Sequence, residues 1–121
     1  MGFQDAVRTG FSKYVDFQGR AARPEYWWWV LFIVIAGIVL QFLDAMLFGM
    51  RGGIGVLHGL FSLATLLPGI SVSIRRLHDV DKSGWLLLIA FIPLIGALVL
   101  LYFMVQRGTI GPNRFGPEQP A

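Results

Sequence analysis

The stretch RRLHDVDKSGW, residues 75–85, connects two segments that are too apolar to face water. It gathers arginines, a histidine, two aspartates and a lysine into one short connection, and a tryptophan ends it. The apolar segments on its two sides, 54–74 and 85–105, contain no Asp, Glu, Lys or Arg. At a rise of about 1.5 Å per residue, each can cross a hydrocarbon core of about 30 Å. Because backbone polar groups find no water in that core, the sequence predicts that both segments are helices.

The composition is that of a membrane protein with one domain. The chain has 121 residues, of which 55% are hydrophobic and 14% are charged, whereas a soluble domain carries about a quarter charged residues. Cysteine is absent, which excludes disulfides, thiolate metal sites and cysteine catalysis. A net charge of +3 is compatible with nucleic-acid binding, but in so apolar a chain it favours basic residues that face anionic lipid headgroups. We therefore expect membrane lipids as partners and no nucleic acid.

An amphipathic segment precedes the apolar runs. Phe3, Val7, Phe11 and Tyr14 follow one another at steps of three or four residues, so they share one face of a helix. Arg8 and Lys13 fall elsewhere on the helical wheel. This pattern predicts an interfacial helix over residues 3–17 that lies flat on the membrane.

The first apolar run, 26–48, follows a helix-start signal. Pro24 suits the first turn of a helix, where its missing N–H is not needed, and Glu25 favours the positive end of the helix dipole. The YWWW sequence at 26–29 is typical of the headgroup level of a bilayer. The fold class predicted for residues 1–121 is an all-α integral membrane domain. Its expected elements are the interfacial helix, three transmembrane helices at 26–48, 54–74 and 85–105, and an irregular Gly/Pro-rich C-terminal tail at 106–121.

Lysine and arginine set the expected orientation, because they are enriched in cytoplasmic loops. With three full spans, Arg51, Arg107 and Arg114 lie on one side and all other Lys and Arg on the other. This places the N-terminus in the cytoplasm and the C-terminus outside it. Pro93 and Gly96 interrupt the third run at its middle, and a re-entrant hairpin there would return the tail to the cytoplasm. We favour the full span, because re-entrant backbone must be shielded by protein.

The charged stretch has two interpretations. Arg75 and Arg76 precede Asp79 at helical salt-bridge spacings, provided that the second helix continues to that point. In one interpretation the guanidiniums are forked donors to an anion or lipid phosphate, with His78 as a titratable gate. In the other they anchor the helix end through local ion pairs. The candidate residues for binding an anion, a lipid or a partner are Arg20, Arg23, Arg75, Arg76, His78, Asp79, Lys82 and Trp85.

Small residues form a stripe on the second run. Thr65, Gly69 and Ser73 recur every four residues, and Gly55 and Gly59 form a GxxxG pair on the same segment. Small residues let helix backbones approach closely, and hydroxyl groups can bond across helices. We therefore predict helix packing here, either within the chain or between copies of it.

The sequence contains no recognisable catalytic arrangement, so we expect a protein that is not an enzyme. His78, Asp79 and Asp81 form a loose set of metal-ligand types, but the neighbouring arginines repel a cation, and we expect no metal and no cofactor. Ser83 precedes the third run and is predicted to cap its helix. Asp44 lies near the outer end of the first run and is interpreted as interfacial.

Several motifs of the chain occur together in a known family. They are FxGRxxRxxYW at 17–27, RRLHD at 75–79, SGW at 83–85, PxxG at 93–96 and GxxGxNRFGP at 108–117. On these motifs the chain resembles the domain-of-unknown-function 805 family of small bacterial inner-membrane proteins of the YhaH type, over nearly its whole length. The resemblance implies a compact multi-helix protein of the bacterial inner membrane without an established activity or catalytic residues. It also groups Asn113 with Arg20, Arg23, Arg75, Arg76, His78, Asp79 and Trp85.

These observations lead to two hypotheses of function. The first is a non-enzymatic inner-membrane module that self-associates or docks on another membrane protein, and whose cytoplasmic basic face binds anionic headgroups or an acidic partner. The alternative is a subunit of an oligomeric channel or transporter for ions or small solutes. The alternative lacks an acidic or basic residue at bilayer mid-depth in the second and third runs.

Overall fold

The computed structural model describes residues 2–49 and 55–118, and over these it is helical. This agrees with the predicted all-α class. Arg51 and the start of the second run at residue 54 lie outside the described residues, as do the last residues of the tail. The elements in chain order are α1 (Phe3–Ser12), α2 (Arg23–Phe48), α3 (Val56–Asp79), the 3-10 helix η2 (Gly84–Phe91) and α4 (Ile95–Val105).

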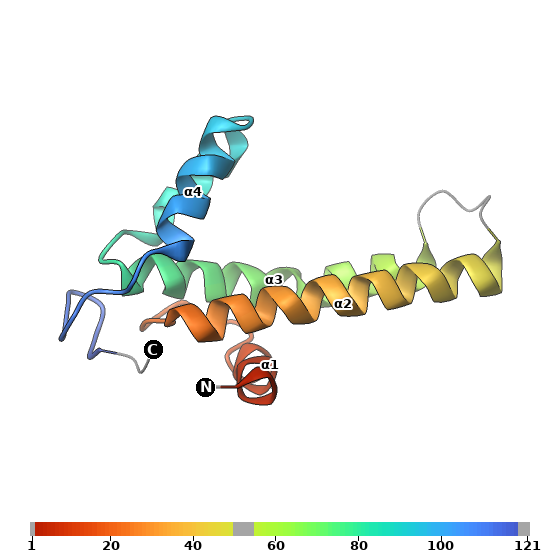
Figure 1. Ribbon diagram of the computed structural model, residues 1–121, viewed down its shortest axis with the longest axis horizontal. Helices are drawn as coiled ribbons and strands as arrows, with labels where there is room; N and C mark the ends of the chain where they lie inside the picture. The colour runs from red at the N-terminus through yellow and green to blue at the C-terminus, as the bar shows by residue number, and fades with distance from the viewer. Residues whose placement is uncertain (1, 50–54, 119–121) are drawn as a thin grey trace.

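Two long helices form the body of the molecule. α2 and α3 lie side by side and run in opposite directions (Figure 1). Both are long and apolar enough to cross a membrane. α2 agrees closely with the predicted run 26–48, and Pro24 stands in its first turn as expected. α3 does not end at residue 74 but continues to Asp79, so the charged RRLHD stretch is its last turn and not a loop.

The predicted third span, residues 85–105, is not one continuous helix. The chain leaves α3 through η2, turns at Pro93 and Leu94, and returns through α4 as a hairpin (Figure 1). Leu94 has a positive φ of 62°, and a Cβ on Gly96 would overlap the backbone carbonyl of Ile89. Proline has no N–H to continue a helix and glycine permits this close approach, so these residues reverse the chain instead of kinking a helix. Ser83 caps η2 as predicted, because its Oγ accepts the Trp85 N–H at 3.3 Å.

The N-terminal helix packs on the first half of α2. It ends at Ser12 and not at the predicted residue 17. Phe3 and Phe11 meet Trp28 and Trp29 of α2 edge to face, with ring centroids 6.0 and 5.3 Å apart. In Figure 1 α1 is seen nearly along its axis while α2 runs across the view, so α1 lies across α2.

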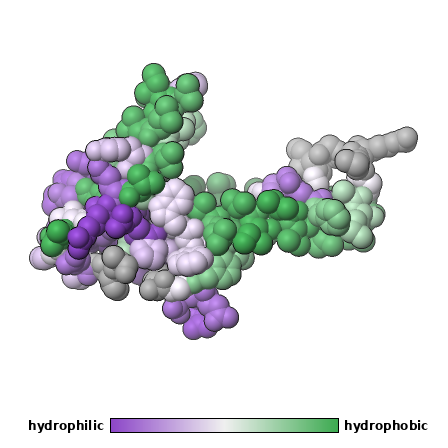
Figure 2. Space-filling model, viewed as in Figure 1, coloured by the Kyte–Doolittle hydropathy of each residue, from purple (hydrophilic) through white to green (hydrophobic). Residues whose placement is uncertain are grey.

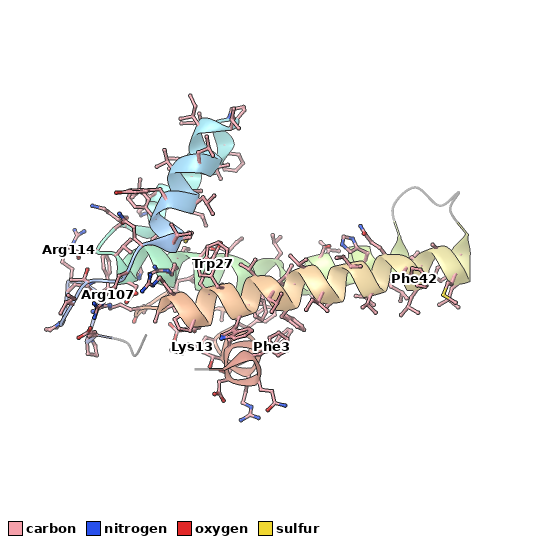
Figure 3. The ribbon with its side chains drawn as sticks, viewed as in Figure 1. Phe3, Lys13, Trp27, Phe42, Arg107 and Arg114 are labelled. Atoms are coloured by element: carbon pink, nitrogen blue, oxygen red, sulfur yellow. The ribbon has the colours of Figure 1, made fainter. Side chains whose placement is uncertain are left out.

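The two ends of the α2–α3 pair differ in polarity. Figure 2 shows hydrophilic residues gathered at the end where α2 starts, α3 stops and the tail folds, and on the outer side of α1, whereas most of the surface along α2 and α3 is hydrophobic. In Figure 3, Arg107 and Arg114 of the tail lie at this polar end and Phe42 lies towards the other. The full-span prediction required the tail to lie at the end opposite the start of α2. The structure instead places the tail at the same end as the start of α2.

Candidate functional site

The centre of the polar end is one carboxylate shared by two arginines. Asp79, the last residue of α3, accepts the Arg20 Nε–H at Oδ1 and the Arg76 Nη1–H at Oδ2, both at 2.9 Å. The exposed fractions are 2% for Arg20, 0% for Arg76 and 3% for Asp79. The predicted helical pair of Arg76 with Asp79 is thus present, and Arg20, 59 residues away, is its second partner.

The remaining donors of these arginines hold the tail. Arg20 Nη2 donates to Thr109 O at 2.7 Å, and the Thr109 N–H returns a bond to Asp79 O at 2.7 Å. Backbone carbonyls are good partners for a guanidinium because its fixed fork of N–H groups can bond several at once. The other acceptors are Gly111 and Gly116 for Arg20, and Met104 and Gln106 for Arg76.

Arg75 has a different partner from the predicted one. Its Nη1 lies 2.5 Å from Glu25 Oε1 in α2, and the predicted pair with Asp79 is not formed. Glu25, which the sequence suggested only as a helix-dipole residue, is 5% exposed. The Arg75 Nε–H donates to Ser71 Oγ at 3.4 Å. Among the described residues, Arg75 Nη2 has no hydrogen-bond partner.

His78 joins the segment before α2 to the tail. Its Nδ1 lies 2.9 Å from Gly19 O, and because a carbonyl oxygen only accepts, Nδ1 carries the proton here. The imidazole stacks on Phe115 with ring centroids 3.9 Å apart and an angle of 2° between the planes. The Asn113 side chain donates to His78 O at 2.9 Å. The resemblance grouped Asn113 with these residues, and the structure brings them together; a gating role for His78 stays a prediction.

The other three candidate residues lie outside this buried network. Arg23, Lys82 and Trp85 are exposed. Arg23 makes one long hydrogen bond, from Nη1 to Val105 O at 3.5 Å, and Lys82 Nζ lies 5.9 Å from the centre of the Phe103 ring. The predicted set thus divides into buried side chains with protein partners and exposed side chains that remain accessible.

The small-residue stripe of α3 faces α2 across a groove. The hydroxyls of Thr65 and Ser73 donate to carbonyls of their own helix, Phe61 O and Gly69 O, both at 2.8 Å. Thr65, Gly69 and Ser73 line a groove of about 460 Å³ between α2 and α3, and the packing of another copy there stays a prediction. At the far end Gly55 meets α2 closely, because a Cβ there would overlap the Asp44 carboxylate; Gly59 is half-buried.

Asp44 has a role that sequence reasoning missed. It is 5% exposed, and its two carboxylate oxygens accept the N–H groups of Leu57 and His58 at 2.8 and 2.9 Å. These N–H groups belong to the first turn of α3 and have no partner within the helix. Asp44 therefore caps α3 from α2, and no local sequence signal marks this cap because Asp44 lies 13 residues before Leu57.

No group of His, Cys, Asp and Glu large enough to hold a metal ion occurs in residues 2–49 and 55–118. The arginines around Asp79 instead hold backbone carbonyls of the C-terminal part of the chain.

Comparison with known proteins finds one matching family model and relatives named as inner membrane proteins. The family model described as "Protein of unknown function (DUF805)" matches residues 14–117. The chain is 47% identical over 108 residues to "Inner membrane protein YhaH" of Escherichia coli strain K12, covering 88% of this chain and 89% of that protein. It is 46% identical over 107 residues to "Inner membrane protein YhaI" of the same strain, covering 88% of each. No solved structure matches the chain.

Proposed function

The chain belongs to the DUF805 family of proteins of unknown function, and we propose that it is an inner-membrane module without catalytic activity that binds anionic lipid headgroups at its polar end. The relatives named as inner membrane proteins support the location. One observation carries the lipid-binding part. Arg20, Arg75 and Arg76 are buried and bonded to other residues of the chain, whereas the other cations at the same end are exposed.

The hairpin of η2 and α4 supports a topology with two spans. A 3-10 helix rises about 2.0 Å and an α-helix about 1.5 Å per residue. The 8 residues of η2 and the 11 residues of α4 therefore each cover about half of a hydrocarbon core of about 30 Å. We propose that α2 and α3 cross the membrane and that the hairpin enters one leaflet only, which returns the tail to the side of α1.

The distribution of basic residues supports a cytoplasmic polar end. Cytoplasmic segments of inner-membrane proteins carry an excess of Lys and Arg. Every Lys and Arg of residues 2–49 and 55–118 lies in α1, in its link to α2, or at the polar end. They are Arg8, Lys13, Arg20, Arg23, Arg75, Arg76, Lys82, Arg107 and Arg114.

Self-association or docking on another membrane protein is the second part of the proposal. Its support is the groove between α2 and α3, where Thr65, Gly69 and Ser73 leave room for close approach of another helix. The mass of the chain extracted in mild detergent tests it, and a strictly monomeric species would remove this part alone. No observation favours the channel alternative.

Single cysteines test the topology, because the chain has none of its own. A cysteine replacing Glu118 is expected to react with an impermeant maleimide only after the cells are permeabilised. A cysteine replacing Phe48, which is 58% exposed at the far end of α2, is expected to react in intact cells. Labelling of the Glu118 position from outside would overturn the proposed topology.

Lipid retention tests the binding part. We expect the chain, released from nanodiscs that contain equal amounts of phosphatidylglycerol and phosphatidylethanolamine, to retain phosphatidylglycerol preferentially in native mass spectrometry. Equal retention of both lipids would show that the exposed cations have no preference for anionic headgroups and would refute this part.

A further inference from the structure

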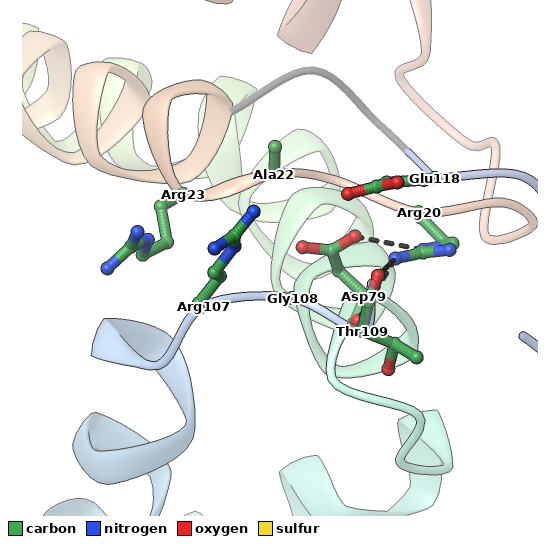
Figure 4. Close-up of a pocket in the computed structure, with 8 residues that line it drawn as sticks. All are labelled: Arg20, Ala22, Arg23, Asp79, Arg107, Gly108, Thr109 and Glu118. Atoms are coloured by element: carbon green, nitrogen blue, oxygen red, sulfur yellow. Dashed lines mark hydrogen bonds and ion pairs between the residues drawn. The ribbon is translucent and has the colours of Figure 1, made fainter. Parts of the chain in front are cut away.

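A small hollow at the polar end has two accessible guanidiniums at its edge. Arg23, in the first turn of α2, and Arg107, just after α4, both line it, with Arg20 and Asp79 also in its wall (Figure 4). The hollow holds about 20 Å³, which is room for about one water-sized group. One oxygen of an anion fits inside it, and the rest of the anion would stay at its mouth.

These two guanidiniums are the least satisfied cations of the hollow. Arg23 makes only the 3.5 Å bond to Val105 O, which holds it beside the end of α4. No hydrogen bond or ion pair joins Arg107 to another residue in the part of the chain that the structure describes. Two cations on one hollow repel each other, and an anion between them removes that repulsion and accepts forked hydrogen bonds from both.

Two carboxylates also line the hollow, those of Asp79 and Glu118. Both oxygens of Asp79 hold guanidiniums of Arg20 and Arg76. Glu118 is exposed, and its Oε2 accepts the Gly111 N–H at 3.0 Å. Neither acid forms an ion pair with Arg23 or Arg107, so both guanidiniums lack a carboxylate partner in the hollow.

A second, apolar hollow adjoins the first through Arg23. It holds about 350 Å³ and is lined by Arg23, Pro24, Trp27 and Trp28. The Trp27 indole N–H donates to Met104 O at 3.0 Å, which fixes this wall against α4. A ligand that reaches both hollows therefore needs an anionic head and an apolar body next to it. Inorganic phosphate has only the first part, and a phospholipid has both.

We propose that Arg23 and Arg107 clamp the phosphate of an anionic phospholipid, whose glycerol and upper acyl portion lies against Trp27 and Trp28. This inference rests on the proposed function and names the residues and the ligand of that binding. Arg107 was not among the residues that the sequence suggested for lipid binding. The clamp joins the start of α2 to the end of α4, so a bound lipid bridges the two-helix body and the hairpin.

The test compares two charge removals at the same end of the full chain. In nanodiscs that contain equal phosphatidylglycerol and phosphatidylethanolamine, Arg107→Gln is expected to retain about tenfold less phosphatidylglycerol than the wild type, the loss of one charge-assisted bond pair. Arg114→Gln removes the same charge, but one that Asp81 already neutralises in an exposed pair, and is expected to lose much less phosphatidylglycerol than Arg107→Gln. The Arg107 side chain is exposed without a described partner, so its replacement leaves the fold intact, which thermal melting checks.

The outcomes separate the clamp from the general function. Equal losses in Arg107→Gln and Arg114→Gln would overturn the clamp but leave headgroup binding by diffuse charge. An absence of any preference for phosphatidylglycerol in the wild type would overturn the proposed function itself. Glycerophosphate and inorganic phosphate serve as competitors without acyl chains, and we expect neither to displace the lipid at millimolar concentration. Displacement by either would show a site for free phosphate and would refute the phospholipid assignment.

Discussion

Replacing Asp79 by asparagine should release the tail from the end of α3. Each carboxylate oxygen of Asp79 holds a buried guanidinium at 2.9 Å. Asparagine keeps the shape but removes the charge and turns an N–H2 donor towards one arginine. Breaking one buried ion pair costs about 3–5 kcal/mol, because it leaves an uncompensated charge away from water. Since one carboxylate serves both Arg20 and Arg76, we expect Asp79→Asn to lower the free energy of unfolding by about that amount.

Two measurements follow this change. The first is the free energy of unfolding in mild micelles, measured by titration with a denaturing detergent and read by tryptophan fluorescence. The second is the rate of tryptic cleavage after Arg107 and Arg114, which should rise because the tail carbonyls lose the arginines that hold them. The control is Asp81→Asn, since Asp81 pairs with Arg114 at 3.1 Å where the side chains are 43% and 66% exposed. Exposed pairs contribute about 0–1 kcal/mol.

The comparison of Asp79→Asn with Asp81→Asn tests whether Asp79 holds the buried arginines and whether these arginines hold the tail. If Asp79→Asn loses no more stability than Asp81→Asn, the carboxylate does not hold the buried arginines. If stability falls but the tail is cleaved at the wild-type rate, the tail is held by something other than Arg20 and Arg76. Either result contradicts our account of the polar end.

Two further changes test contacts at the opposite ends of the molecule by the same unfolding measurement. Gly108→Ala should lower the free energy of unfolding by about 1–3 kcal/mol, because the new Cβ would overlap the fixed Asp79 carboxylate. Gly2→Ala is its control, since nothing lies within 4 Å of a Cβ there. Equal free energies of unfolding for the two variants would contradict the close approach of Gly108 to Asp79. Asp44→Ala should lower the free energy of unfolding by about 0.5–2 kcal/mol, because it removes the cap of α3. Asp44→Asn should lower it less, because the amide keeps one acceptor oxygen. An Asp44→Ala variant as stable as the wild type would show that the cap is not needed.

The long helices and the helix starts were predictable because their signals are local. Pro24 and the aromatic run after it place the start of α2 within a few residues, and Ser83 caps η2 where expected. The hydrophobic length of α2 and α3 follows directly from composition. These features depend on neighbouring residues or on the hydrophobicity of one segment, and both can be recognised in a single sequence.

The end of α3 and the hairpin were not predictable in the same way. Residues 75–79 appear as a loop in the sequence because their charges are too costly to bury alone. They form helix because Glu25, Arg20 and the tail carbonyls supply partners, and Arg20 lies 91 and 96 residues before two of them. Pro93 and Gly96 were recognised as an interruption, but the choice between a kink and a reversal depends on where the tail binds.

The contacts of Arg20 also bear on how the chain is made. Ribosomes produce Arg20 long before Gly111 and Gly116, whose carbonyls it bonds at 2.8 and 3.2 Å. A chain cut short before residue 109 lacks the carbonyls of Thr109, Gly111 and Gly116, so its Arg20 guanidinium keeps only the bonds to Asp79. The polar end is therefore completed only when the last part of the chain has been made.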